Sequence, residues 1–180
     1  MKDYTELSNT ESVDKIIKRN WLHTCWLGAN CGPFYYNNAL YSIACNSAFH
    51  VVCVYKSTHD SSSWIELDGG NNPPCSTTYY GCTGYLSDST LWITYYNTSD
   101  NAVIVQPFNL SSGVWENTLP STGTITISSS YPSLVIAMDN NDNIVVATSG
   151  DYNRYDANNS SWCGWAKLGS SLSRHIFGGC

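Results

Sequence analysis

The chain has 180 residues, of which 42% are hydrophobic, 13% aromatic and 12% charged, and its net charge is −6. This apolar and aromatic content can bury a core and so excludes a disordered chain, while eight Lys and Arg residues are too few for a nucleic-acid-binding face. No apolar run approaches the ~18 residues of a membrane-spanning helix, so no span is expected.

Residues 1–20 differ in composition from the rest and are expected to form a separate arm. One short helix is predicted there over 10–19, with Ser12 as its cap and Ile16 and Ile17 as its apolar contact. This start lacks the apolar core of a secretory signal peptide. Residues 21–180 are expected to form one β-repeat domain.

Short strands dominate the sequence after residue 21. They are rich in Val, Ile, Thr and Tyr and are bounded by Gly, Asn, Asp and Ser, which is typical of strands joined by tight turns. Strands are predicted over 39–44, 50–55, 91–96, 102–108, 122–128, 133–138 and 143–148. Hairpin turns are predicted over 45–47, 97–100, 111–113 and 139–142. The pattern therefore predicts an all-β protein.

A tryptophan follows a polar turn three times, at Trp64, Trp115 and Trp162, with spacings of 51 and 47 residues. In the last two copies an aromatic residue stands seven places earlier, followed at once by an Asn or Asp: Phe108 and Asn109, then Tyr155 and Asp156. An Asn or Asp side chain can accept bonds from backbone amides of the turn, while the two rings pack across the hairpin. The three tryptophans are therefore expected in the core. A repeat of about 50 residues that contains about four strands has the length of a β-propeller blade.

The segment 132–150 (PSLVIAMDNNDNIVVATSG), continuing to Trp162, resembles a blade of the Asp-box repeats found in sialidase-type β-propellers. That family places a Ser, Asp, Gly, Thr, Trp turn between the third and fourth strands of each blade. Here the turn is degenerate in all three copies. Its Asp lies one place early, at Asp156, in the copy of Trp162, and Asn109 replaces it in the copy of Trp115. In the first copy the Asp is displaced to Asp60. The resemblance implies a partial β-propeller of about three blades, and three blades cannot close a ring without further blades or a paired chain. A β-sandwich is the alternative.

Eight cysteines are spaced as four local pairs, which favours disulfides over reduced thiols or a zinc site. The candidate pairs are Cys25 with Cys31, Cys45 with Cys53, Cys75 with Cys82, and Cys163 with Cys180. Each short loop would add roughly 2–3 kcal/mol. Glycosylation sequons begin at Asn97, Asn109, Asn158 and Asn159. An extracellular, cell-surface or virion location is expected.

The ionisable residues do not form a recognisable catalytic or metal-binding set. The sialidase resemblance implies three arginines on separate blades, but Arg19 and Arg174 fall outside the expected blades and Arg154 stands at no strand start. Glu66 and Glu116 follow the repeat tryptophans, which indicates structural equivalence. The series Asp139-x-Asn141-x-Asn143 half-matches a calcium loop but favours a hairpin turn. No cofactor, metal or catalytic residue is expected.

Tyrosine doublets at 35–36, 79–80 and 95–96 are the candidate ligand-binding feature. Successive strand residues face opposite ways, so one ring of each doublet is expected to face outward. Tyr36, Tyr80 and Tyr96 are the candidates to stack on a sugar or anchor a protein contact. The alternative is one core ring and one ring on the sheet surface.

These features predict a non-catalytic module on a cell surface, virion or filament, serving adhesion, glycan binding or assembly. Its expected partners are further copies of itself, neighbouring subunits or glycans. Two alternatives stay open: a glycan-processing, sialidase-like hydrolase, and a purely architectural subunit whose tyrosine-rich surfaces pack against its neighbours.

Overall fold

The computed structural model describes residues 30–46, 51–58, 63–67, 82–125, 134–139, 141–148 and 150–167, and these ranges contain strands and turns but no helix. The strands are β1 (Asn30–Tyr36), β2 (Ala39–Asn46), β3 (Val51–Thr58), β4 (Ile65–Leu67), β5 (Cys82–Ser87), β6 (Thr90–Asn97), β7 (Ala102–Asn109), β8 (Val114–Trp115), β9 (Leu134–Met138), β10 (Ile144–Thr148), β11 (Asp151–Asp156), β12 (Ser161–Trp162) and β13 (Ala166–Lys167). The predicted all-β class is confirmed. The helix predicted over 10–19 lies outside the described residues.

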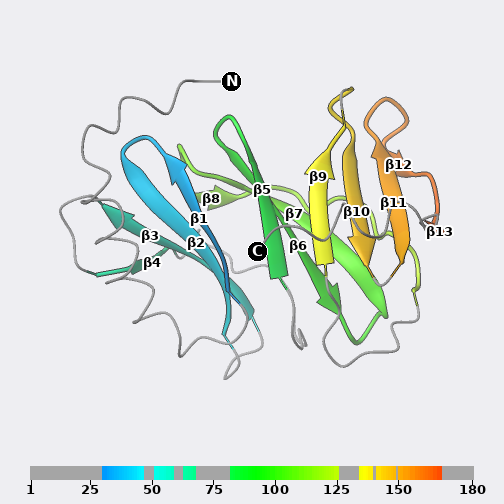
Figure 1. Cartoon of the computed structure of the whole chain (residues 1–180), viewed down its shortest axis with the longest axis horizontal. Helices are drawn as coiled ribbons and strands as arrows, with labels where there is room; N and C mark the ends of the chain where they lie inside the picture. Colours follow the sequence, from blue (N-terminus) through cyan, green and yellow to red (C-terminus); the bar gives the residue numbers. More distant parts are fainter. Residues whose placement is uncertain are drawn as a thin grey trace.

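The strands form three antiparallel sheets, and each sheet is built from strands that are consecutive in the chain (Figure 1). Sheet 1 has the order β1-β2-β3-β4, sheet 2 has β5-β6-β7-β8, and sheet 3 has β9-β10-β11-β12 with β13 paired to β11. Each repeat of the sequence is therefore one sheet. Three sheets differ from the two of a sandwich, and they do not close into a ring.

Six of the seven predicted strands are confirmed, as β2, β3, β6, β7, β9 and β10. The strand predicted over 122–128 is wrong in its described part, where Thr124 makes an isolated bridge with Ala102 and no strand forms. This segment is held by single contacts instead, because Thr122 Oγ1 donates to the carbonyl of Val103. The turn predicted over 45–47 is also displaced, because β2 continues to Asn46, which pairs with Val51.

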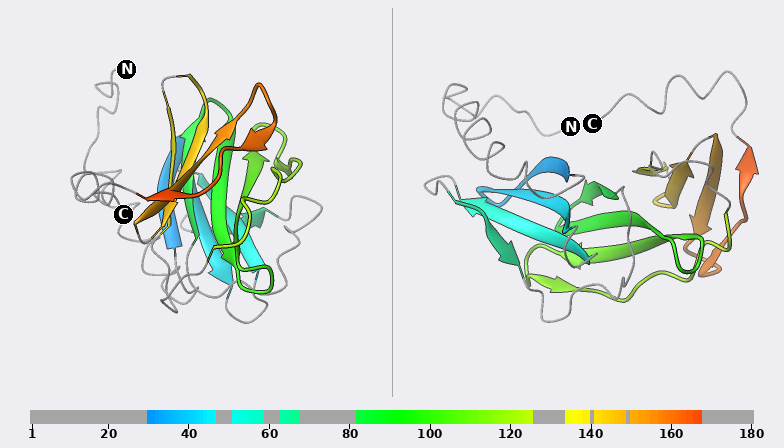
Figure 2. Two further views of the ribbon diagram at one scale, coloured as in Figure 1. Left: turned by 90° about the vertical axis from the view of Figure 1, so that its right-hand side faces the viewer. Right: turned by 90° about the horizontal axis from the view of Figure 1, so that it is seen from below.

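The three sheets follow one another across the molecule, with β5 between β1 and β9 (Figure 2). One apolar cluster lies between sheets 1 and 2 and includes Ile43, Val54 and Phe108. A second lies between sheets 2 and 3 and includes Val105 and Val146. Sheet 2 is therefore buried on both faces.

Gly84 on β5 marks a close approach between sheets 1 and 2. A Cβ atom at this position would overlap the Cδ1 atom of Ile43 and would lie 3.2 Å from Cζ of Phe34. Ile43 is itself fully buried, so it has little room to move. The absence of a side chain at residue 84 is thus what lets the two sheets come together here.

Candidate functional site

The repeat tryptophans lie at the fourth strand of each sheet: Trp64 directly precedes β4, and Trp115 and Trp162 are the second residues of β8 and β12. Trp115 packs against Phe108 in a T-shaped pair with ring centroids 4.8 Å apart, and Trp162 packs against Tyr155 at 5.3 Å. Both pairs are cross-strand partners. Trp64 packs against a third buried cluster, formed by Ala44, Cys53 and Tyr55. All three indoles are half-buried, so they pack against the buried clusters and are not members of them.

The turns before the last two tryptophans use the same backbone chemistry. Asn109 Oδ1 accepts from the amides of Ser111 and Ser112 at 3.0 and 3.1 Å. Asp156 Oδ1 accepts from the amides two and three residues on, at 3.0 and 3.3 Å. A hydrogen bond from the side chain of Asn159 is the main reason that the pKa of Asp156 is lowered. The predicted side-chain-to-backbone bonds are confirmed in both copies.

Asp139 organises the hairpin between β9 and β10. Its Oδ1 atom accepts from the amides of Asn141 and Asn143 at 2.8 and 2.9 Å, and both carboxylate oxygens accept from Asn143 Nδ2. These bonds lower the pKa of Asp139, with the side chain of Asn143 as the largest cause. The half-matched calcium loop is therefore a turn whose carboxylate is occupied by donors of its own hairpin.

The lowered pKa of Asp139 predicts a pH dependence of stability. A carboxyl group with a lowered pKa in the folded state stabilises the fold above its ordinary pKa, and that contribution is lost as the pH falls through the lowered value. We expect the stability of wild type to fall more steeply than that of Asp139→Asn as the pH is lowered below about 4, measured by urea unfolding. The Asn109 turn is a natural precedent, since an amide accepts the same backbone bonds there. Equal slopes for the two proteins would contradict this role.

The two glutamates that follow repeat tryptophans both serve structural bonds. Glu66 accepts from the hydroxyl of Tyr55 at 3.0 Å, and burial is the main reason that the pKa of Tyr55 is raised. Glu116 accepts from Asn109 Nδ2 at 3.1 Å, across the β7–β8 hairpin. The predicted structural equivalence holds in part, since each glutamate braces its own sheet, although through a different partner.

The tyrosine doublets differ from expectation. Tyr95 and Tyr96 are both buried, because sheet 2 is covered on both faces, so the expectation that one ring faces outward is wrong for this doublet. Tyr96 donates to Asn101 Oδ1 at 3.1 Å, and Tyr36 is half-buried and bonds to Ser111 Oγ at 2.6 Å. The exposed ring of the first doublet is Tyr35, at 49%. Tyr80 lies outside the described residues.

The cysteine pairing stays a prediction. Cys31, Cys53 and Cys82 are buried and Cys163 is exposed. Cys25, Cys75 and Cys180 lie outside the described residues, and of Cys45 only the strand register is described. That register pairs Cys45 with Val52, and Ala44 with Cys53. Each candidate pair thus has a member whose side chain lies beyond the described part of the chain.

The glycosylation candidates differ in accessibility. Asn97 is 9% exposed, and its amide donates to Asp100 while its carbonyl accepts from the amide of Ser99. The amide of Asn109 is occupied by Glu116, and that of Asn159 by Asp156. Asn158 lies exposed at the tip of the β11–β12 turn. Its sequon is therefore the most accessible of the four.

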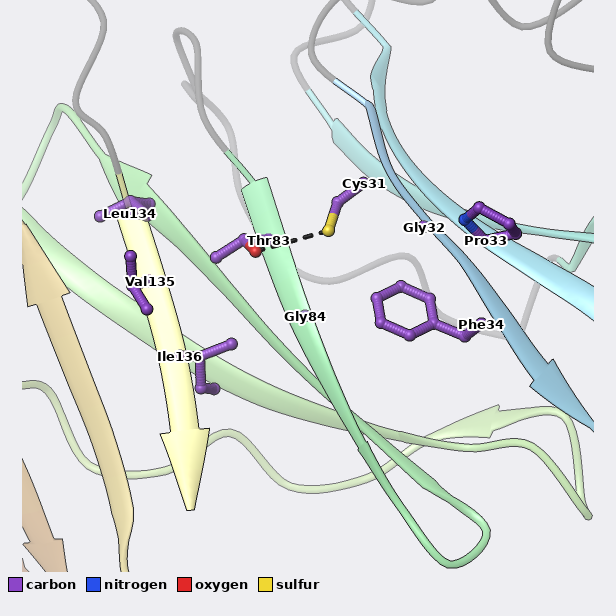
Figure 3. Close-up of a pocket in the computed structure, with 9 residues that line it drawn as sticks. All are labelled: Cys31, Gly32, Pro33, Phe34, Thr83, Gly84, Leu134, Val135 and Ile136. Atoms are coloured by element: carbon purple, nitrogen blue, oxygen red, sulfur yellow. Dashed lines mark hydrogen bonds between the residues drawn. The ribbon is translucent and has the colours of Figure 1, made fainter. Parts of the chain in front are cut away.

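A cavity of about 280 Å³ lies where the first strands of the three sheets meet (Figure 3). Its described lining comes from Cys31, Gly32, Pro33 and Phe34 on β1, Thr83 and Gly84 on β5, and Leu134, Val135 and Ile136 on β9. The polar side-chain contact is a hydrogen bond of 3.4 Å between Cys31 Sγ and Thr83 Oγ1. The lining is mainly apolar and backbone, which suits contact with an apolar group better than proton transfer.

The cavity was not predicted from the sequence, because β1 and β5 were not predicted as strands. β1 carries a Gly-Pro pair at a register shift, and Pro cannot donate to a ladder. Glycines within a strand can mark a close approach of another backbone, so Gly32 and Gly84 are the signal that could have indicated this site. Arg154 lies on β11 and is not part of the described lining.

Neither a protein-family model nor a curated protein matches the chain. Within the described ranges, no three His, Cys, Asp or Glu side chains are grouped so as to hold a metal ion. None of the described ranges contains a helix long and apolar enough to cross a membrane.

Proposed function

We propose that this chain is a non-catalytic binding and assembly module that acts outside the cytosol, built as three blades of an incomplete β-propeller of the Asp-box type. Three features support the blade assignment. Each sheet contains a four-stranded meander, the aromatic turn stands between the third and fourth strands of sheets 2 and 3, and the first strands of the three sheets meet around one cavity. Propeller blades share this arrangement.

The observation that carries the non-catalytic assignment is the environment of the acidic residues. Glu66, Glu116, Asp139 and Asp156 each accept hydrogen bonds within their own sheet. The described lining of the central cavity, in contrast, contains no acid or base. A glycoside hydrolase needs two carboxyl groups facing its substrate, and here the carboxylates brace turns and hairpins instead.

The proposal is tested by assaying the purified chain for hydrolysis of sialosides and other glycosides, together with a glycan array and a measurement of mass in solution. We expect no turnover, and either self-association or retention on glycans. Hydrolysis that depends on the protein concentration would overturn the proposal and favour the hydrolase alternative.

A substitution at the exposed ring of Tyr35 can distinguish glycan binding from a purely architectural role. Its hydroxyl donates to Asn38 Oδ1 at 2.8 Å, which fixes the ring at the surface. If glycans are the ligand through this ring, Tyr35→Ala should lower array retention while its mass in solution stays that of wild type. Self-association without any glycan retention would favour the architectural alternative.

A further inference from the structure

The four asparagines that begin glycosylation sequons have different tasks in the fold. They are Asn97, Asn109, Asn158 and Asn159. An N-linked glycan is bonded to the amide nitrogen Nδ2 of its asparagine, and it is bulky and lies in solvent. A glycosylated asparagine of the folded chain therefore needs an exposed side chain whose amide nitrogen is not held by the fold. The four residues differ in both respects.

Asn97 closes the hairpin between β6 and β7. It is 9% exposed, its Oδ1 atom accepts from the amide of Ser99 at 2.9 Å, and its Nδ2 atom donates to Asp100 Oδ2 at 2.8 Å. Both ends of this amide are thus used to form the turn. A glycan on the buried nitrogen would open the hairpin, so the folded chain carries none here.

Asn109 has the same duty in the turn between β7 and β8. Its Oδ1 atom accepts from two backbone amides of the turn, and its Nδ2 atom donates to Glu116 Oε1 at 3.1 Å. The hydroxyl of its sequon, Ser111 Oγ, bonds to the hydroxyl of Tyr36 on sheet 1 at 2.6 Å. Turns favour an Asn followed by small hydroxyl residues, and this sequon is accounted for by that need.

The turn between β11 and β12 is capped by an aspartate instead. Asp156 Oδ1 accepts from the backbone amides of Asn158 and Asn159, so neither asparagine side chain is needed for the cap. Asn159 Nδ2 donates to Asp156 Oδ2 at 2.7 Å, a short bond to a charged acceptor. The side chain of Asn158 makes no hydrogen bond within the described ranges. Asn158 is thus the one sequon asparagine that the fold leaves unused.

The surroundings of Asn158 also leave room for a large group. Residues 157–160 are all exposed. The turn that they form projects beyond the strands that it joins, as the orange loop at the upper right of Figure 1. A branched sugar at this tip would extend into solvent without displacing a strand.

We propose that Asn158 carries the N-linked glycan of this chain. In the transfer, Asn158 Nδ2 forms a bond to C1 of an N-acetylglucosamine and releases one proton to solvent. The bond from C1 to the pyrophosphate of a lipid-linked oligosaccharide breaks, and the lipid pyrophosphate is the leaving group. This inference rests on the proposed location outside the cytosol, because sequons are modified in secreted chains.

Two neighbouring serines provide a matched pair of variants. A sequon requires a hydroxyl residue two places after its asparagine. Ser160→Ala therefore removes the sequon of Asn158 and keeps that of Asn159, whereas Ser161→Ala removes the sequon of Asn159 and keeps that of Asn158. Both serines are exposed, and circular dichroism checks that each variant keeps the wild-type fold.

The full-length chain, directed into the secretory pathway of animal cells by an added leader, is purified from the cells and their medium. Peptide-N-glycosidase then converts each glycosylated Asn to Asp, which a peptide mass map locates. We expect conversion at Asn158 in wild type and in Ser161→Ala. Ser160→Ala is expected to lower the occupancy of Asn158 at least about tenfold.

The outcomes distinguish this inference from the proposed function. Wild type without a glycan, or with a glycan at another sequon in place of Asn158, would overturn the inference. Occupancy that is lost in Ser161→Ala and kept in Ser160→Ala would also overturn it. Either result leaves the non-catalytic binding role in place. Glycoside turnover would overturn that role whatever the occupancy of Asn158.

Discussion

Phe108→Ala is expected to lower the free energy of unfolding by about 4 kcal/mol, because it removes a fully buried ring and leaves a cavity. Phe108 lies in the cluster between sheets 1 and 2 and makes the edge-on contact with Trp115. The loss therefore acts on both a hairpin and an interface between sheets. Urea unfolding followed by tryptophan fluorescence measures it.

Val114→Ala is the matched control for the same hairpin. Val114 is 43% exposed and neighbours Trp115 on β8, so its truncation should change stability by no more than about 0.5 kcal/mol. If Phe108→Ala cost as little as this control, the aromatic pair would be a surface feature and the repeat would have no role in the core.

Gly84→Ala is expected to cost about 2 kcal/mol through overpacking, since the added methyl group would overlap Ile43 Cδ1. Ile43→Val removes that methyl group and so makes room for the new one. In the Ile43→Val background the Gly84→Ala change should therefore cost about 1 kcal/mol less. The four proteins form a double-mutant cycle, measured by denaturant unfolding.

If the effects of the two substitutions on the free energy of unfolding were additive, the packing explanation for Gly84 would be wrong. The cost of the Ala substitution would then come from somewhere other than the approach of sheets 1 and 2. A coupling of the expected sign ties the glycine to this interface, because the two residues belong to different sheets.

The repeat was predictable because its signals are local. A turn needs a polar residue that bonds the next amides, and Asn109 and Asp156 supply it within three residues. The rings of Phe108 and Tyr155 meet a tryptophan seven places on. Short-range chemistry of this kind is visible in a sequence, so the hairpins and the all-β class followed from it.

Burial of both faces was not predictable from the same pattern. Alternation along a strand separates its two faces, but it does not say whether a second sheet covers the outer one. Tyr96 was therefore expected to be exposed and is 7% exposed. The central cavity has a similar cause, because β1, β5 and β9 come from three repeats and only the packing of whole sheets brings them together.

The order of the strands has a consequence for folding during synthesis. Apart from the β11–β13 contact, each ladder within the three sheets joins strands that are neighbours in the sequence. Pairing between such neighbours closes short loops and is fast, so each hairpin can form while the ribosome is still adding the next one. Synthesis from the N-terminus would thus lay down one finished meander at a time, with little delay between translation and folding.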